Sequence, residues 1–94
     1  MSVDEMRELE LWAEALIDDH DHMREALIEL RRRHKLTQAQ VGERMGVSQP
    51  VVAAFERYDA NPTLATVRRY ALAVGAMIDT RVLSAATPRP RVRE

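Results

Sequence analysis

Two histidines lie among acidic residues near the N-terminus, and such side chains have the chemistry of metal ligands. His20 and His22 alternate with Asp18, Asp19 and Asp21, but no further ligand converges on them by spacing. Adjacent acidic residues are also common where helices begin, so we expect no metal site. The 94 residues include no cysteine, which excludes disulfides and thiolate zinc sites. No catalytic triad, carboxylate pair or glycine-rich phosphate loop stands out, so we expect neither an enzyme nor a cofactor or small-molecule ligand.

The charge of the chain is divided between its two parts. Residues 1–30 hold ten acidic residues and two arginines, a net charge of −8, whereas residues 31–94 hold twelve basic and five acidic residues, a net charge of +7. This asymmetry favours nucleic-acid contact by the basic part, although solvated helices need charges of either sign. The acidic start differs from a signal peptide, and no apolar run approaches the ~20 residues that span a bilayer. We therefore expect a soluble, cytoplasmic single domain.

Helix caps and breakers give the organisation of the chain. Ser2 with Glu5 predicts the start of an acidic amphipathic helix over residues 1–19, with apolar residues at spacings of three and four. The capping residues at 18–22 predict that a second helix begins there, and a single long helix through them is the alternative.

Caps and terminators continue after residue 36. The residues with this chemistry are Thr37, Gln40, Gly46, Ser48, Pro50, Thr63 and Gly75. They predict short helices over 37–45 and 48–57 and a longer helix over 63–74. Alternation at 77–83 predicts a short strand that could pair in a dimer, and residues 84–94 are expected to form a flexible tail.

The segment 38–57 predicts a tight pair of helices. Gly42 has no side chain to hold a crossing helix away, and Gly46 supplies the left-handed residue of the turn. The apolar residues expected at the contact are Val41, Met45, Val47, Val52 and Phe55. The second helix of the pair would then be exposed along its outer side.

This segment resembles a known family. The stretch LTQAQVGERMGVSQPVVAAFE, with NPTLATVRRYALAVGA after it, is similar to the lambda-repressor-like (Xre/Cro) helix-turn-helix regulators of bacteria and phages. The resemblance covers about residues 23–76 and implies an all-α, five-helix domain over residues 20–76, whose third helix enters the DNA major groove within a homodimer. The additional N-terminal helix and the strand at 77–83 also resemble features of host-inhibition antitoxins in that family.

The resemblance further implies which residues contact DNA. Gln38 and Ser48 would bind phosphate, and the Gln49 amide would pair with adenine N6 and N7. The whole expected set is Gln38, Arg44, Ser48, Gln49, Pro50, Val51, Ala53, Ala54 and Arg57. Many relatives carry serine and arginine at the two alanine positions, so we expect little hydrogen-bond readout beyond Gln49, with apolar contact to thymine methyls in addition.

Several of these features have structural alternatives. For Arg31 the resemblance implies an ion pair with Glu56 that ties two helices together. Arg44, Arg57, Arg68 and Arg69 could bind phosphate or simply solvate the surface. The stripe that includes Trp12 could form a groove for a partner or pack within its own domain or dimer.

Two functions remain. The first is a sequence-specific transcriptional repressor that binds double-stranded DNA as a homodimer on an inverted-repeat operator. The alternative is an antitoxin whose acidic N-terminal helix masks a basic, RNase-like toxin while the helix-turn-helix regulates the operon. A third reading is a helix-turn-helix that has been reused only for partner binding.

Overall fold

Four helices form the described part of the chain. The computed structural model describes residues 1–85. The helices are α1 (Val3–Arg33), α2 (Gln38–Met45), α3 (Gln49–Phe55) and α4 (Leu64–Val74). The expected all-α class is therefore confirmed. No helix among residues 1–85 combines the length and the apolar content needed to cross a membrane.

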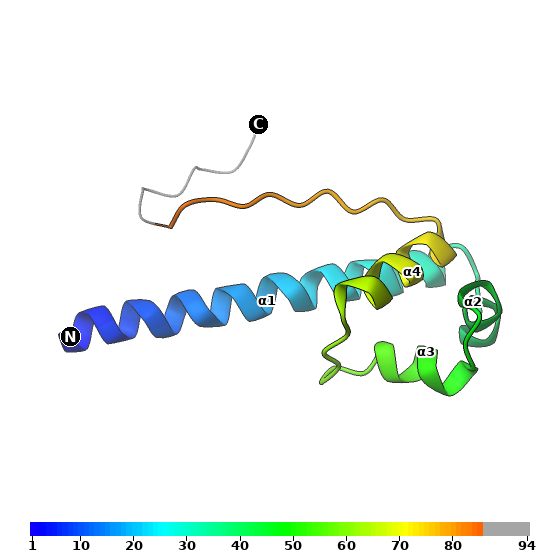
Figure 1. Ribbon diagram of the computed structural model, residues 1–94, viewed down its shortest axis with the longest axis horizontal. Coiled ribbons are helices and arrows are strands. Elements are labelled where there is room, and N and C mark those ends of the chain that lie inside the picture. Colours follow the sequence, from blue (N-terminus) through cyan, green and yellow to red (C-terminus); the bar gives the residue numbers. More distant parts are fainter. Residues whose placement is uncertain (86–94) are drawn as a thin grey trace.

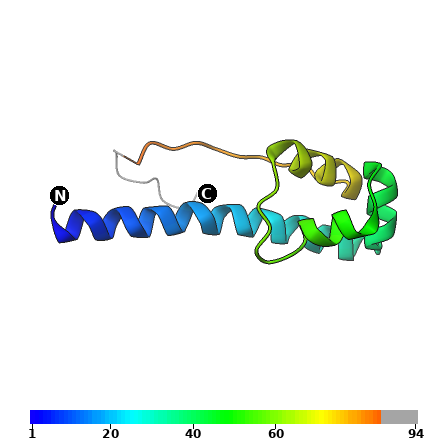
Figure 2. The same ribbon diagram turned by 60° about the horizontal axis from the view of Figure 1, so that its bottom comes forward.

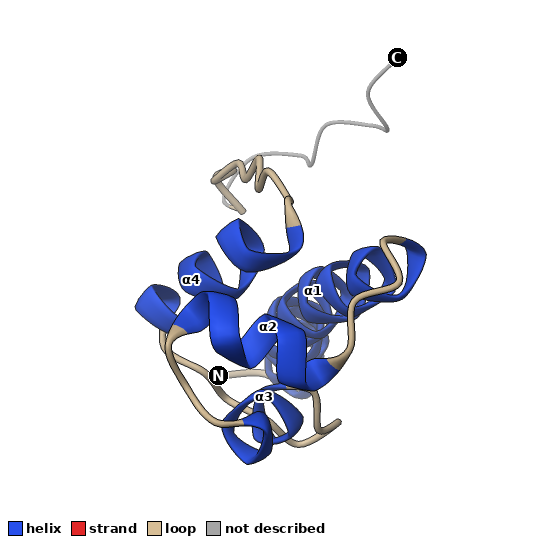
Figure 3. Ribbon diagram, turned by 90° about the vertical axis from the view of Figure 1, so that its right-hand side faces the viewer, coloured by secondary structure: helices blue, strands red, loops and turns tan. Residues whose placement is uncertain are grey.

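The first helix is a rod that carries a compact cluster at one end. Helices α2, α3 and α4 gather around the C-terminal end of α1, as the view down this end shows (Figure 3). The N-terminal half of α1 projects away from the cluster, and the chain that follows α4 turns back in the direction of the N-terminus (Figures 1 and 2).

The sequence predicted a new helix at residues 18–22, with a single long helix as the alternative, and the structure shows the alternative. α1 runs without a break from Val3, after the cap at Ser2, to Arg33. The Ser2 hydroxyl accepts a hydrogen bond from the Glu5 backbone N–H at 3.1 Å. Residues 18–22 contain neither glycine nor proline, and helix interiors tolerate their side chains, so nothing forces the chain to break there.

The expected five-helix count and the expected strand are not found either. The described residues hold four helices, and residues 77–83 are extended but unpaired. A strand needs hydrogen bonds to the backbone of another segment, and the described part of a single chain offers none to this one. Of the expected tail, residues 86–94 lie outside the described residues.

The predicted contact between α2 and α3 is confirmed in its geometry. Thr37 and Gln40 form a reciprocal capping box, with hydrogen bonds of 2.8 and 3.1 Å. Gly46 ends α2 in the left-handed conformation, with φ at 73°. A Cβ added at Gly42 would lie 2.8 Å from the Val47 carbonyl oxygen, so only glycine lets the two helices approach this closely.

The core joins all four helices. Its most buried side chains are Val41, Val52, Tyr70 and Val74, and Leu27 and Ile28 contribute from α1. The rings of Phe55 and Tyr70 stack with their centroids 4.1 Å apart, which fixes α3 against α4.

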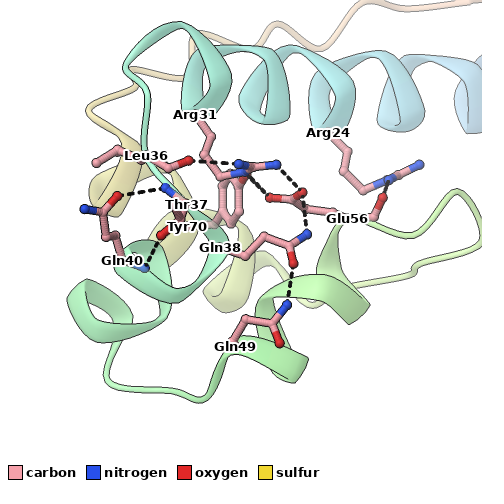
Figure 4. A network of polar contacts seen from close by, with 9 residues as sticks. All are labelled: Arg24, Arg31, Leu36, Thr37, Gln38, Gln40, Gln49, Glu56 and Tyr70. Carbon is pink, nitrogen blue, oxygen red and sulfur yellow. Dashed lines mark hydrogen bonds and ion pairs between the residues drawn. The ribbon is translucent and has the colours of Figure 1, made fainter.

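A single carboxylate links the helices at the edge of this core. Glu56, directly after α3, accepts hydrogen bonds from Arg31 at 2.6 and 2.9 Å, from Gln38 at 3.0 Å and from the Tyr70 hydroxyl at 2.7 Å (Figure 4). Its side chain is only 7% exposed. Arg31 also donates to the Leu36 carbonyl at 2.8 Å. The ion pair implied by the resemblance is thus present, within a larger network.

This network sets the ionisation of its members. Burial alone would raise the pKa of the Glu56 carboxyl, but the hydrogen bonds from Arg31, Gln38 and Tyr70 outweigh it, so that pKa lies below its ordinary value. Burial and the hydrogen bond to Glu56 raise the pKa of the Tyr70 hydroxyl. The hydrogen bond to Glu56 raises the pKa of Arg31 as well.

Arg24 was missed in the sequence as a structural residue. It is 3% exposed and donates to the carbonyls of Glu56 at 3.1 Å and Tyr58 at 3.3 Å, beyond the end of α3. These carbonyls have no partner within the helix, so Arg24 satisfies them from α1. The signal was an arginine on the apolar face of the predicted helix, between Met23 and Leu27.

Replacing Glu56 with glutamine should destabilise the protein by about 2–3 kcal/mol at neutral pH, because Arg31 would keep its charge in a mostly buried position without an anion. The folded-state pKa of Glu56 is lowered, so its contribution is complete above the ordinary carboxyl pKa and is lost as pH falls through the folded pKa.

Urea unfolding of the wild type and of Glu56→Gln would check both statements. The stability difference should be full at pH 7 and should shrink as the pH is lowered below about 4. Glu43→Gln, at an exposed position of α2, is the matched control and should be nearly neutral. A difference between Glu56→Gln and wild type that is unchanged across this pH range would contradict the role of the ion pair.

Candidate nucleic-acid interface

Helix α3 presents one side to the core and the other to solvent. Val52 and Phe55 are buried, whereas Gln49, Pro50 and Val51 are exposed. Of the two alanines in the expected set, Ala54 is exposed and Ala53 is half-buried. Pro50 lies in the first turn of the helix, where its missing N–H has no helical partner to lose. An exposed, mostly apolar edge results, as the sequence predicts.

Ser48 occupies the N-cap position of α3, but its side chain forms no capping hydrogen bond. Its extended backbone, with φ at −77° and ψ at 161°, has the expected N-cap geometry. Its carbonyl accepts hydrogen bonds from the backbone N–H groups of Val51 at 3.1 Å and Val52 at 3.4 Å. The hydroxyl of Ser48 is therefore not used to cap the helix and lies on its exposed N-terminal edge.

The two glutamines of the expected set touch each other. The side-chain amide of Gln49 donates to the side-chain oxygen Oε1 of Gln38 at 2.5 Å, and the side-chain amide of Gln38 donates to the Glu56 carboxylate at 3.0 Å (Figure 4). A primary amide has two N–H donors and one acceptor oxygen. The contact with Gln38 therefore uses one donor of Gln49 and leaves one donor and the acceptor.

This remaining pair has the polarity that an adenine edge requires. Adenine presents an acceptor at N7 and a donor at N6 in the major groove. Gln49 can thus keep its contact with Gln38 and still offer both groups to a base. Gln38, half-buried at the start of α2, has a second side-chain N–H, and free N–H groups at the start of a helix attract phosphate.

The arginines around this face have protein partners. Arg57 forms a two-point ion pair with Asp59, at 3.0 and 3.1 Å, with both side chains exposed. The hydrogen bond from Arg57 lowers the pKa of Asp59. Arg44 donates instead to the Ala73 carbonyl at 2.9 Å, and Arg69 donates to the Met45 carbonyl. The last two arginines thus join the C-terminal end of α2 to α4.

The structure brings some of the expected residues together and holds others in contacts with the rest of the protein. Gln38, Ser48 and Gln49 lie together where α2 and α3 begin, and Pro50 and Val51 extend this patch along α3. Arg44 is held against α4, so a phosphate contact from it would compete with its bond to Ala73. The pairing of Arg57 with Asp59 and the two carbonyl bonds of Arg44 and Arg69 were missed in the sequence, because no spacing rule connects these residues.

Comparisons with known proteins agree with this geometry. Residues 27–76 match the helix-turn-helix family. The chain is similar to Antitoxin HigA1 of Mycobacterium tuberculosis, from strain CDC 1551 / Oshkosh and from strain ATCC 25618 / H37Rv, with 46% identity over 54 residues in each case. The aligned part is 57% of this chain and 36% of each relative.

The chain thus matches only about a third of the length of these relatives. No solved structure gives a significant match. The family match spans more than half of the chain and contains α2, α3 and α4 with the end of α1. It confirms the resemblance seen in the sequence: this chain belongs to the helix-turn-helix family.

Proposed function

We propose that the protein is a transcriptional regulator that binds double-stranded DNA with α3 in the major groove, and that it acts as a repressor. The family match supports DNA binding. The observation that carries the proposal is the contact between Gln38 and Gln49, because it leaves on Gln49 the donor and acceptor that adenine complements. Gln38 and Ser48 would bind the flanking phosphates, and Pro50, Val51, Ala53 and Ala54 would contact thymine methyls.

The free energy of base discrimination expected from one α3 helix is small, which favours a homodimer. One bidentate glutamine contributes about 1–3 kcal/mol of base discrimination, and the alanines of α3 add no hydrogen bond. Specific regulators typically exceed their nonspecific affinity by about 4–10 kcal/mol. Two copies on an inverted repeat would double the readout, and the unpaired, extended residues 77–83 are the segment we propose for their pairing.

A second candidate function is that of an antitoxin. The two relatives from M. tuberculosis are named antitoxins. In this chain the acidic residues gather in the part of α1 that projects from the DNA-binding cluster (Figure 1). A basic protein could be bound there while α3 remains available to DNA.

Changing Gln49 to alanine should lower the preference for a selected operator by about 1–3 kcal/mol, with a smaller effect on random DNA, because the variant loses the base contact and keeps the proposed phosphate contacts of Gln38 and Ser48. Gel-shift titrations on both DNAs would measure this, after selection of the operator from a random pool with the wild type. Gln40→Ala removes a glutamine from α2 instead and should leave the preference intact. Equal losses on both DNAs for Gln49→Ala would refute its role.

Arg57 and Asp59 should act in opposite directions. Arg57→Ala should weaken binding to every sequence and reduce the slope of log affinity against log salt by about one, because a phosphate contact releases one counterion. Asp59→Asn should strengthen binding to every sequence, because it frees the Arg57 guanidinium. An unchanged salt slope for Arg57→Ala would exclude the phosphate contact.

Deleting residues 77–94 should impair dimer formation, because it removes the proposed pairing segment. Sedimentation equilibrium of the wild type and the shortened chain over the same concentration range would measure the change. The helical content should stay constant, since the deletion leaves α1 to α4 intact. A shortened chain that dimerises as tightly as the wild type would move the interface to the helices.

A further inference from the structure

The apolar seam of α1 continues beyond the domain that it stabilises. Residues at alternating spacings of three and four form one face of the helix. They are Met6, Leu9, Ala13, Leu16, His20, Met23, Leu27 and Leu30. The seam packs into the cluster from Met23 onward, but Met6, Leu9 and Leu16 are 46%, 45% and 62% exposed. Residues 3–19, which we call the free segment of α1, lie beside no other described helix (Figures 1 and 2).

An extended strip of chain forms a groove with the free segment. Residues 81–85 run beside it, and the groove between them has a volume of about 500 Å³. Leu11, Trp12 and Leu16 line one wall, and residues 81–85 form the other. Trp12 is still 49% exposed and Val82 fully exposed, so the strip leaves the apolar surface accessible.

Charge decides which partner fits this surface. The free segment carries seven acidic residues and one arginine, a net charge of −6. If Met6 and Ala13 occupy position a of a heptad repeat, the charged residues at the flanking positions e and g are Glu5, Glu10 and Asp19. All three are acidic. A second copy would place acid against acid in either orientation, which disfavours self-pairing. DNA and anionic membranes are repelled for the same reason.

We propose that the free segment, with its groove, binds a protein partner through an amphipathic element whose apolar seam is flanked by lysine or arginine. The apolar seam would supply the contact area, and the acidic flanks would select the partner and its register. Trp12, where the seam meets the groove, would be an anchor of the interface. This inference rests on the second candidate function, which places a basic protein on the same part of α1, and it adds the kind of element through which that protein would bind.

The test uses two synthetic helical peptides and the full chain. Both peptides have about three heptads with leucine in the seam, and the flanking positions are lysine in one and glutamate in the other. Trp12 is the only tryptophan, so its emission reports binding directly. The lysine peptide should shift the Trp12 emission to the blue in a saturable way, with a Kd of the order of micromolar. This Kd should increase when the salt concentration is raised from about 50 to about 300 mM. The glutamate peptide should bind at least about tenfold more weakly.

Two variants separate this interface from nonspecific adhesion. Leu9→Lys with Leu16→Lys, both at exposed positions, should abolish binding of the lysine peptide, whereas Leu72→Lys on α4 should not, although Leu72 is 84% exposed. Glu5→Lys with Glu10→Lys and Asp19→Lys should reverse the preference toward the glutamate peptide. Circular dichroism would verify that each variant is folded.

Three results would overturn the proposal. The first is equal binding of both peptides, and the second is a peptide preference that the charge reversal leaves unchanged. The third is a wild-type dimer that dissociates when Leu9→Lys and Leu16→Lys are introduced, because a second copy would then occupy the surface. The titration contains no DNA, so its failure is distinguishable from a failure of operator binding.

Discussion

The arrangement of the helices depends on one buried carboxylate. Glu56 receives donors from α1, α2 and α4, and it directly follows α3, so all four helices meet at its two oxygens. Removing a carboxylate from water costs several kcal/mol, and one partner seldom offsets that cost. Four hydrogen bonds, two of them from a guanidinium in the two-point geometry, satisfy this group and make its burial tolerable. Tyr70, fully buried, needs the same carboxylate for its hydroxyl.

A continuous chain of hydrogen bonds connects this centre to the exposed face. Glu56 orients the Gln38 amide, and Gln38 orients the Gln49 amide. Side chains held in this way lose little rotational freedom when they meet a ligand, which is the usual benefit of a preorganised site. In the proposed complex with DNA, the sparse donors of α3 would limit how many bases are distinguished, while the Gln49 amide would already be held in place by Gln38.

The sequence predicted the features of this fold that depend on local chemistry. Gly46 in the turn, the capping box of Thr37 with Gln40 and the close approach at Gly42 follow from the steric demands of single residues. Features that depend on residues far apart in the chain were harder to predict from the sequence. Arg24, Arg44 and Arg69 each bind a carbonyl more than twenty residues away, and no periodicity encodes such pairs.

Two expectations that the single chain does not show, the helix start at 18–22 and the strand at 77–83, also have a physical cause. Capping residues at 18–22 permit a helix to begin but do not require it, and the heptad spacing across them favours continuation. Residues 77–83 alternate as a strand would, but alternation describes only the side chains, and a strand exists only where another backbone pairs with it. For the candidate site, the sequence predicted which residues share the exposed edge, whereas the direction of each amide depended on the folded network.

The uninterrupted backbone of α1 has a mechanical consequence. The seventeen residues from 3 to 19 extend about 25 Å at the rise of an α-helix, without glycine or proline to act as a hinge. A protein bound to this stiff arm, as proposed above, would lie outside the cluster of α2, α3 and α4 that carries the proposed DNA-binding face (Figure 1).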